Sequence, residues 1–335
     1  MLKNKTLFTI SILASMMALS ACQPKQTEPK EDPVQKQSTV EPEILKLTGD
    51  SEKLALVLPE CDGNNCPEIS IERLSSNQAF IDELIDQQIL KQLNQIIDIS
   101  PKLLKADQQA ASTADPKDIQ VSDQATAAKP LATVETAKQK LEKQVTPYLV
   151  TFLALDKELK ALSANHQISL MIKPKILNAN LPLATVVLNS SSYLGGAHGS
   201  SSQRYYNFDL KQQKQVELND LLAPNQKAHL EKKAHEVFKT WVLESKLANS
   251  VEEYEQAWKF KLSENYYLGQ QGLILQYAEY EIGPYVVGLP RLTIPYAELQ
   301  GILKAAYLPV TEAASEATAK STEASAANAT TKAKS

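Results

Sequence analysis

The spacing of apolar residues changes near Gln167, and this change constrains the fold more than any other feature of the sequence. Before it, apolar side chains recur three or four residues apart over 80–97 and 141–159, which is typical of helices with one buried face. After it, residues 168–172 alternate between apolar and polar, and 181–188 is nearly continuous and β-rich. Strands and helices therefore form separate clusters. We expect an α+β fold with antiparallel sheets, helices packed on one side, and two consecutive modules.

Capping residues, glycines and prolines bound the expected elements. Strands are expected at 53–58, 68–74, 167–172, 181–188, 203–210 and 291–295, and helices at 77–97, 134–162, 226–247 and 251–261. Asn219 or Asp220 should cap a short helical turn, and a further helix should carry Leu299, Ile302 and Leu303. The stretch NYYLGQQGLILQY, with glycines on both sides of its turn, predicts a hairpin.

The amino terminus has the layout of a bacterial export signal. Lys3 and Lys5 precede an apolar run over 7–19, which is too short to span a bilayer, since a span needs about 20 residues. The run ends in Leu-Ser-Ala-Cys, which resembles the lipobox of lipoproteins, where cleavage frees the cysteine and its thiol is acylated. We therefore expect residues 1–21 to be a signal peptide and Cys22 to be lipidated, although a plain secretory signal is an alternative.

A lipid on Cys22 would hold the mature chain at a membrane, because several acyl chains on one residue give lasting attachment. Gln23 favours sorting to the outer membrane, since an aspartate there is the usual retention signal, so we expect the chain on the periplasmic face of that membrane. Loss of Lys3 and Lys5 with the leader would lower the formal charge from −4 to −6. This acidic balance argues against a nucleic-acid partner.

Two further cysteines, Cys61 and Cys66, flank the turn-forming sequence Asp-Gly-Asn-Asn. An exported chain meets an oxidising compartment, and such a turn can bring two cysteines within bridging distance. A redox centre would more often have the C-x-x-C spacing, and the four histidines do not supply zinc partners at ligand spacing. We expect a structural disulfide and no metal site.

Three segments of biased composition separate the regions that can form a core. The expected organisation is a signal peptide at 1–21, a disordered tether at 22–44, a smaller α/β module at 45–165 with a disordered insertion near 106–130, a second domain at 166–308, and a disordered tail at 309–335.

Five stretches of the second half occur in a fixed order. They are YLGGAHGSSSQRYYNFDL, VELNDLL, the GLILQY hairpin, YEIGPYVVGLP and RLTIPYAEL. Together they resemble the RsiV-like extracytoplasmic family, found in the outer half of the lysozyme-sensing anti-sigma factor RsiV and upstream of the catalytic domain of a peptidoglycan deacetylase. The resemblance covers about residues 165–306. Residues 45–165 are similar, more loosely, to the smaller module that precedes this domain in the same proteins.

The resemblance implies a non-catalytic envelope module, without a cofactor, that binds a lysozyme-like protein or a peptidoglycan-associated partner. We expect this chain to have neither the cytoplasmic sigma-binding segment and membrane helix of the anti-sigma factor nor a deacetylase domain. We therefore expect neither sigma-factor signalling nor amide hydrolysis. A structural lipoprotein that serves envelope assembly is a further alternative.

The histidine at position 198 allows three interpretations. Gly195, Gly196 and Gly199 permit a tight bend, in which His198 would only bond the loop to the core. Alternatively, the glycine loop and nearby tyrosines form a recognition surface, because rigid rings with polar tips suit protein or glycan contacts. In the third, His198 is the base or metal ligand of a cell-wall hydrolase or deacetylase accessory protein. Its neighbours would be Ser200–Ser202 and carboxylates such as Asp209, Glu279 or Glu281. The sequence G-A-H-G-S argues against this interpretation, because it is not a nucleophile elbow.

The glycine loop and the YEIGPYVVGLP loop together form the expected ligand face. Its candidate residues are Tyr193, Gly195, Gly196, His198, Arg204, Tyr205, Tyr280, Tyr285 and Arg291, with no catalytic residue among them. A structural ion pair of Arg204 or Arg291 with Asp209, Glu279 or Glu281 is also expected. His229 and His235 should be solvated, because six residues of separation place them on different helix faces.

Overall fold

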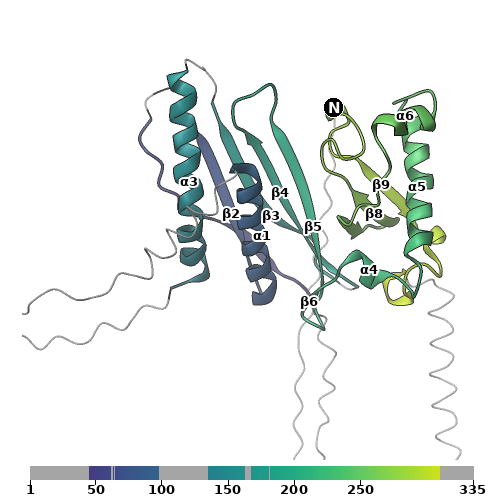
Figure 1. The fold of residues 1–335 in the computed structure, drawn as a ribbon. Coiled ribbons are helices and arrows are strands. Elements are labelled where there is room, and N and C mark those ends of the chain that lie inside the picture. Colours follow the sequence, from purple (N-terminus) through teal and green to yellow (C-terminus); the bar gives the residue numbers. More distant parts are fainter. Residues whose placement is uncertain are drawn as a thin grey trace, which may run out of the picture. The chain divides into compact units, whose positions relative to one another are not determined.

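A computed structural model describes residues 45–61, 63, 65–97, 135–162, 167–180 and 182–309 (Figure 1). Cys22, the leader, the tether, the 106–130 insertion and the tail beyond residue 309 lie outside these residues. The described chain forms a six-stranded sheet, a three-stranded sheet and several helices, which confirms the predicted α+β class. No helix in this part of the chain has the length and apolar character needed to cross a membrane.

The six-stranded sheet has the strand order β1-β2-β3-β4-β5-β6. Its strands are β1 (Gly49–Lys53), β2 (Glu68–Ser76), β3 (Ser169–Asn178), β4 (Ala184–Tyr193), β5 (Ser200–Asp209) and β6 (Lys214–Gln215). β2 and β3 are parallel, and the other neighbours are antiparallel. A parallel pair needs a long crossover, and the chain between these strands includes α1 (Ala79–Ile97) and α3 (Ala137–Ala161).

Both helices pack on one face of this sheet (Figure 1). On α1, Ile81, Ile85, Ile89 and Leu93 recur every four residues and are fully buried, as their spacing predicts. α3 begins with a capping box in which the Thr136 side chain accepts from the backbone N–H of Gln139 and the Gln139 side chain accepts from the backbone N–H of Thr136. The expected helices at 77–97 and 134–162 are therefore confirmed.

The second part of the chain builds the three-stranded sheet, in the order β7-β8-β9, and its helices. These elements are α4 (Leu218–Leu221), α5 (Lys227–Glu244), α6 (Val251–Ala257), β7 (Tyr266–Leu268), β8 (Gly272–Gln276), the 3₁₀ turn η1 (Tyr285–Val287), β9 (Arg291–Pro295), and the 3₁₀ turns η2 (Tyr296–Leu299) and η3 (Ala305–Tyr307). The predicted hairpin is confirmed, because β7 and β8 pair antiparallel around its turn. β9 ends at Pro295, as predicted.

Two hydrophobic clusters form inside the described chain. The first runs from Leu47 to Leu210 and joins α1 and α3 to the helix-facing residues of the six-stranded sheet. The second includes Leu183 and then runs from Val216 to Leu303. β3, β4 and β5 thus pack mainly in the first cluster, and the division of the cores does not coincide with the predicted module boundary at residue 165.

Side chains of the second part bond the free edge of β5. The Asn265 amide accepts from the Tyr205 backbone N–H at 2.8 Å and donates to the Gln203 carbonyl at 2.7 Å. The Asn207 side chain donates to the Tyr266 carbonyl at 2.8 Å, and the Tyr205 and Tyr267 rings stack with their centroids 4.3 Å apart. These contacts tie the two clusters together.

Three local predictions were wrong. The first strand is β1, over 49–53, and residues 54–58 are outside it, because Leu54 and Leu56 turn toward the first core. The N-cap residue of α4 is Glu217, rather than Asn219 or Asp220, although the Asp220 side chain contributes to the cap by accepting from the Glu217 backbone N–H at 3.0 Å. The segment around Leu299 forms 3₁₀ turns instead of an α-helix.

Candidate functional site

The predicted ligand face brings together two loops that are distant in the sequence. The β4–β5 hairpin supplies His198, and the segment after β8 supplies Tyr280 and Tyr285. The Tyr285 ring stacks on the His198 ring with centroids 3.9 Å apart, and its hydroxyl donates to the Gly199 carbonyl at 3.0 Å. The Tyr280 hydroxyl lies 3.1 Å from His198 Nε2. We call His198, Tyr280, Tyr285 and Val286 the aromatic face.

The aromatic face is open to solvent and has a defined shape. His198 is exposed, and Val286 is more exposed than either tyrosine, with 86% of its surface accessible. Tyr280 has a φ of 61°, a conformation that non-glycine residues rarely adopt. Surrounding structure must hold such a residue in place, and strained residues cluster at functional sites.

The glycines of the hairpin have structural reasons for their positions. Gly195 has a φ of 81°, and an added Cβ would lie 2.8 Å from the Leu159 side chain. An added Cβ at Gly199 would lie 2.9 Å from the Ser192 carbonyl oxygen. The Tyr193 hydroxyl also donates to the Gly196 carbonyl at 3.0 Å. Glycine therefore allows the close approach that places His198 beside the tyrosines.

The serines next to His198 bond to a different residue. Ser200 Oγ donates to Glu279 Oε2 at 2.9 Å, and the Ser201 backbone N–H donates to Glu279 Oε1 at 2.9 Å. His198 Nδ1 lies 3.0 Å from the Gly199 carbonyl, and Nε2 faces Tyr280. The described residues thus place no serine against His198 as a hydrolytic pair requires. They also contain no group of three or more His, Cys, Asp or Glu that could hold a metal ion.

Three of the predicted ligand residues lie away from the aromatic face. Arg291 donates from Nε to Gln276 Oε1 at 2.7 Å and from a terminal nitrogen to Gln203 Oε1 at 2.5 Å. Tyr205 is buried against Tyr267, and Arg204 is exposed on β5 beside α1. The predicted carboxylate pairing of Arg204 or Arg291 is wrong, because neither arginine forms a salt bridge within the described part. Neutral amides hold Arg291 instead.

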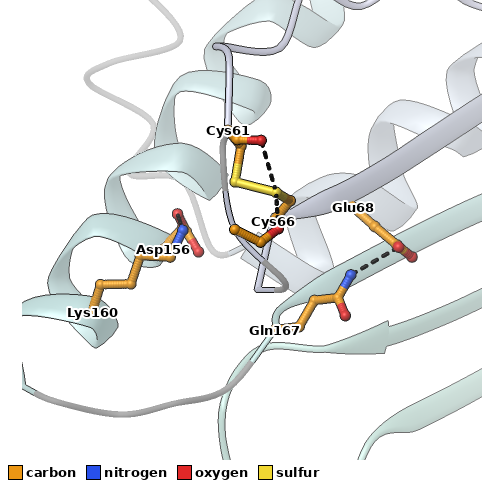
Figure 2. Close-up of a disulfide and its surroundings, with 7 residues drawn as sticks. Cys61, Cys66, Glu68, Asp156, Lys160 and Gln167 are labelled. Carbon is orange, nitrogen blue, oxygen red and sulfur yellow. Dashed lines mark hydrogen bonds and ion pairs between the residues drawn. A yellow bond between two sulfur atoms is a disulfide. The ribbon is translucent and has the colours of Figure 1, made fainter.

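The disulfide between Cys61 and Cys66 is confirmed, with an S–S distance of 2.17 Å (Figure 2). Figure 2 also shows the neighbouring ion pair of Lys160 Nζ with Asp156 Oδ2, at 2.8 Å, and the hydrogen bond from Gln167 to Glu68. The bridge therefore closes a short turn beside the end of α3 and the start of β3.

The prediction for His235 was wrong. Its Nε2 lies 2.8 Å from Glu255 Oε1, and its ring stacks on Phe260 with centroids 4.8 Å apart. His235 therefore links α5 to α6, although it is only partly buried. The partners lie 20 and 25 residues further along the chain, so helical spacing alone could not reveal them.

Sequence reasoning also missed Val286 as a member of the aromatic face, and it named Glu279 only as a carboxylate beside His198 or an arginine, not as the hydrogen-bond acceptor of Ser200 and Ser201. Both belong to the segment that contains Tyr280 and Tyr285. A signal for Val286 was the apolar pair at 286–287 between Pro284 and Gly288, which predicts a loop with apolar residues at its tip. Nothing local indicated that Glu279 would bond Ser200, because this contact joins residues 79 positions apart.

The family match with known proteins concerns the second cluster. Residues 219–297 match the family described as a protein of unknown function, DUF3298. This match spans α4 to β9 and includes Tyr280, Tyr285 and Val286, but not His198. It is shorter than the predicted resemblance over 165–306. No curated protein matches the chain.

Solved structures that are similar to this chain include two of the DUF3298 family. A DUF3298 family protein from Pseudomonas aeruginosa PAO1 is 23% identical, with 80% of this chain and 98% of that chain covered and a TM-score of 0.51. A DUF3298 family member from Bacteroides fragilis NCTC 9343 is 16% identical, with coverages of 78% and 96% and a TM-score of 0.47. The first likeness shows a shared fold, and the second is too weak to carry an argument.

Proposed function

We propose that this chain is a lipid-anchored envelope protein that faces the periplasm and binds another envelope component through the aromatic face. The partner is a lysozyme-like protein or a peptidoglycan-associated partner, and the chain catalyses no reaction on it. The observation that carries the proposal is the exposed stack of His198 on Tyr285, with Tyr280 and Val286 beside it.

The chemistry of the aromatic face suits binding. Tyrosine rings offer a large apolar area with a polar tip and lose little side-chain entropy when they are ordered. Here the His198 and Tyr285 contacts already order the rings before a partner arrives, which lowers the cost of association. Val286 adds an apolar tip that water covers in the free protein.

The partner class and the location rest on sequence resemblances. The RsiV-like motifs suggest lysozyme, because RsiV senses lysozyme, and the match to DUF3298 over 219–297 supports the coarser relationship alone. The lipobox at Cys22 suggests the anchor. The geometry of the aromatic face tests neither the partner class nor the membrane location, so each needs its own experiment.

Binding can be measured on the chain from residue 22 with Cys22→Ser, immobilised and exposed to lysozyme or to purified sacculi. Tyr285→Ala should weaken the interaction about 30-fold, as expected for an aromatic anchor that the partner buries and that contributes about 2 kcal/mol. Val286→Asp should also weaken it. Val57→Asp is the matched control, because Val57 is equally exposed on another surface, with 85% against 86% for Val286.

Two results would contradict the proposal. One is no binding of either lysozyme or sacculi at low salt. The other is equal loss of binding in the Val57→Asp and Val286→Asp variants, since only one of these valines lies on the aromatic face. The anchor has a separate test, in which Cys22→Ser should move the protein from the membrane fraction to the soluble fraction and abolish incorporation of labelled palmitate.

A further inference from the structure

We propose a second binding site, a groove at the β7–β8 turn that takes an uncharged glycan chain. The groove has a volume of about 540 Å³, which is within the usual range for ligand pockets. One wall is the end of β3, with Leu177, and the other is one face of the three-stranded sheet. The hydrogen bond from Asn207 to the Tyr266 carbonyl and the stack of Tyr205 on Tyr267 join the two sheets that carry these walls.

The lining of the groove carries no charge. Among the described residues it consists of leucine, isoleucine, glycine and threonine, one tyrosine, and the carboxamides of one asparagine and two glutamines. An acidic or a basic group placed there would lose its hydration without gaining a partner of opposite charge. The lining therefore favours uncharged ligands over both acidic and basic ones.

Two cations stand near the groove but outside its lining. Lys175 precedes Leu177 by two residues on β3, and Arg291 precedes Thr293 by two residues on β9, so each lies about 7 Å away along its strand. The Arg291 guanidinium is turned to Gln276, to which its Nε donates at 2.7 Å. A ligand seated in the groove thus meets neutral groups.

The floor of the groove is a row of three side chains across the sheet. Tyr267, Ile274 and Thr293 are paired partners on β7, β8 and β9, and three strands at this spacing make a row about 10 Å wide. Tyr267 lines the groove, whereas Tyr205, which stacks on its ring, does not. The stack therefore orders the Tyr267 ring before a ligand binds. Sugar rings have flat apolar C–H faces that pack on such a surface.

Polar contacts come from Gln270, Gln271 and Thr293. All three are exposed, and none of their side chains forms a hydrogen bond with another described residue. A carboxamide and a hydroxyl each offer both a donor and an acceptor, as the hydroxyls of a sugar do. Asn178, the other amide of the lining, already donates to the Leu183 carbonyl at 2.9 Å. The free polar groups thus lie on the turn and on β9.

The β7–β8 turn presents its glutamines from a fixed backbone. The Gly269 N–H donates to the Gly272 carbonyl at 2.9 Å, and the Tyr296 hydroxyl donates to the Gly269 carbonyl at 2.9 Å. An added Cβ at Gly269 would lie 2.6 Å from Cδ1 of Ile274. Glycine at this position therefore leaves room for Ile274 in the floor of the groove.

The shape of the groove favours a glycan over other uncharged ligands. A peptide strand gains main-chain hydrogen bonds by pairing with a free strand edge, but the floor is the face of a sheet whose middle strand, β8, is paired on both sides. An acyl chain would cover the polar groups of the turn without bonding them, which is costly. A chain that combines apolar ring faces with hydroxyl groups meets both parts of the lining.

The groove is separate from the aromatic face. β8 begins beside the groove at Gly272 and ends at Gln276, after which the chain continues to Tyr280 and Tyr285. The length of β8 alone is about 14 Å, so the two sites can be altered independently. This site goes beyond the proposed function, which rests on the aromatic face.

The test is isothermal titration calorimetry on the chain from residue 22 with Cys22→Ser. The ligands are chitotetraose, which is uncharged, the protonated chitosan tetramer and tetragalacturonate. Chitotetraose should bind about tenfold more tightly than either charged chain, because the groove gives a charge no partner. The formal charge of −4 would favour the cationic chain, so tighter binding of the uncharged chain reports on the groove itself.

Variants of exposed residues locate the site. Gln270→Ala and Gln271→Ala should each weaken chitotetraose binding about fivefold, as loss of one hydrogen bond does. Thr293→Trp should abolish it, because strands accept aromatic residues and the large ring fills the groove. Gln212→Ala, which alters an exposed glutamine between β5 and β6, is the matched control and should have no effect. Val286→Asp should also have none, so failure of the lysozyme interaction leaves this test intact.

Several results would overturn the proposal. They are no binding of chitotetraose, equal binding of a charged chain, unchanged binding in Thr293→Trp with a native circular dichroism spectrum, or an equal loss in Gln212→Ala and Gln270→Ala. Loss of binding in Val286→Asp alone would move the sugar to the aromatic face. A peptide of alternating glycine and glutamine that binds more tightly than chitotetraose, and that Thr293→Trp blocks, would assign the groove to a peptide.

Discussion

The two cores of this protein are built from different side chains. The first is mainly aliphatic, with the leucines, isoleucines and valines of α1, α3 and the six-stranded sheet, and few aromatic rings besides Phe152 and Phe208. The second contains Phe238 and several tyrosines among its buried residues, with two tryptophans packed against them. The aliphatic core lies between long regular elements, whereas the aromatic core lies among short strands, 3₁₀ turns and loops.

Buried tyrosines explain how the second core tolerates so much irregular backbone. Three of their hydroxyls donate to loop or element-end carbonyls at 2.8 to 2.9 Å, from Tyr254 to Ile282, Tyr266 to Val216 and Tyr277 to Lys261. The partly buried Tyr296 donates to the Gly269 carbonyl at 2.9 Å in the same way. A buried carbonyl without a partner costs stability, and regular structure normally supplies that partner. Here the side chain fills the core with its ring and satisfies the loop with its hydroxyl.

The first core has longer regular elements, and its loop backbone groups bond to asparagine and glutamate side chains instead, as when the Thr48 N–H donates to Asn77 and the Ala55 N–H donates to Glu142. Its main buried polar contact is between charged groups, where Arg73 donates from Nε and a terminal nitrogen to Asp86 at 2.8 to 3.2 Å. Tyr148, its buried tyrosine, has no hydroxyl partner among the described residues. The contrast teaches that loop-rich packing can be stabilised by aromatic hydroxyls.

The strongest test of the comparison asks whether the two cores unfold together. Phe152→Ala in the first core and Phe238→Ala in the second should each lower the free energy of unfolding by about 3–5 kcal/mol, because both rings are almost completely buried. The contacts of Asn265 and Asn207 across the cores predict one transition in urea, shifted by either change. Two separate transitions, each sensitive to one substitution, would show that the cores are independent.

Alkaline pH should distinguish the cores next. Burial raises the pKa of Tyr266 and Tyr277 well above the usual tyrosine range, and it raises the pKa of Tyr206 in the first region to about 12. Since the folded pKa lies above the unfolded value of about 10, this stability is complete below pH 10 and is lost as the pH rises toward the folded pKa. Because Tyr266 and Tyr277 ionise more readily in the unfolded chain, the free energy of unfolding should fall by about 3 kcal/mol through these two residues by pH 11.

The measurement is urea unfolding between pH 8 and pH 11. A variant with Tyr266→Phe and Tyr277→Phe should lose a large part of the pH dependence, because burial raises the pKa of these two tyrosines furthest, and Tyr206 and the less buried tyrosines supply the rest. An unchanged slope in this variant would mean that another group governs the alkaline loss.

Reduction of the Cys61–Cys66 disulfide should have a smaller effect, which reports on the first region alone. The bridge joins residues five positions apart, and a loop this short contributes about 2 kcal/mol by restricting the unfolded chain. Unfolding in urea with and without a reductant measures this difference. The double variant with Cys61→Ser and Cys66→Ser should not respond to the reductant. If reduction of the natural chain lowered the free energy of unfolding by twice this amount, the turn would stabilise more of the protein than its own segment.

The smallest effect should come from single hydroxyls. Tyr277→Phe removes the hydrogen bond to the Lys261 carbonyl and should cost about 1–1.5 kcal/mol, since the loop can take up water in its place. Tyr148→Phe is the control in the aliphatic core and should change the free energy of unfolding by less than about 0.5 kcal/mol. Equal costs for the two variants would remove the distinction between the cores.

Local patterns predicted most of the regular elements. The four-residue spacing of isoleucines indicated α1, and the glycines at 269 and 272 indicated the β7–β8 hairpin. The parallel pairing of β2 with β3 had no local signal, because it joins Glu68 to Ser169 across the whole crossover. The first strand was misplaced because the pairing of β1 with β2 ends at Lys53, and only Leu54 and Leu56 of the apolar run at 54–58 pack against the core, whereas Val57 is exposed.

The candidate site was predictable in part. Glycines around His198 and Pro284 beside Tyr285 indicated two shaped loops, and these loops do meet. Which polar partner each residue takes was not predictable, since Arg291 selects Gln276 and Gln203 over any carboxylate. Such choices depend on what burial brings together, and that is set by the tertiary fold.

Asn265 has a consequence for how copies of this protein behave when they are crowded. An unpaired strand edge is a template for intermolecular sheet growth and aggregation. The Asn265 carboxamide bonds to the backbone of β5 as the peptide group of a neighbouring strand would. Nearer the hairpin, the Glu279 carboxylate accepts from the backbone N–H of Ser201 on the same strand. The sheet is thereby terminated by side chains, and a second molecule finds this stretch of backbone already engaged.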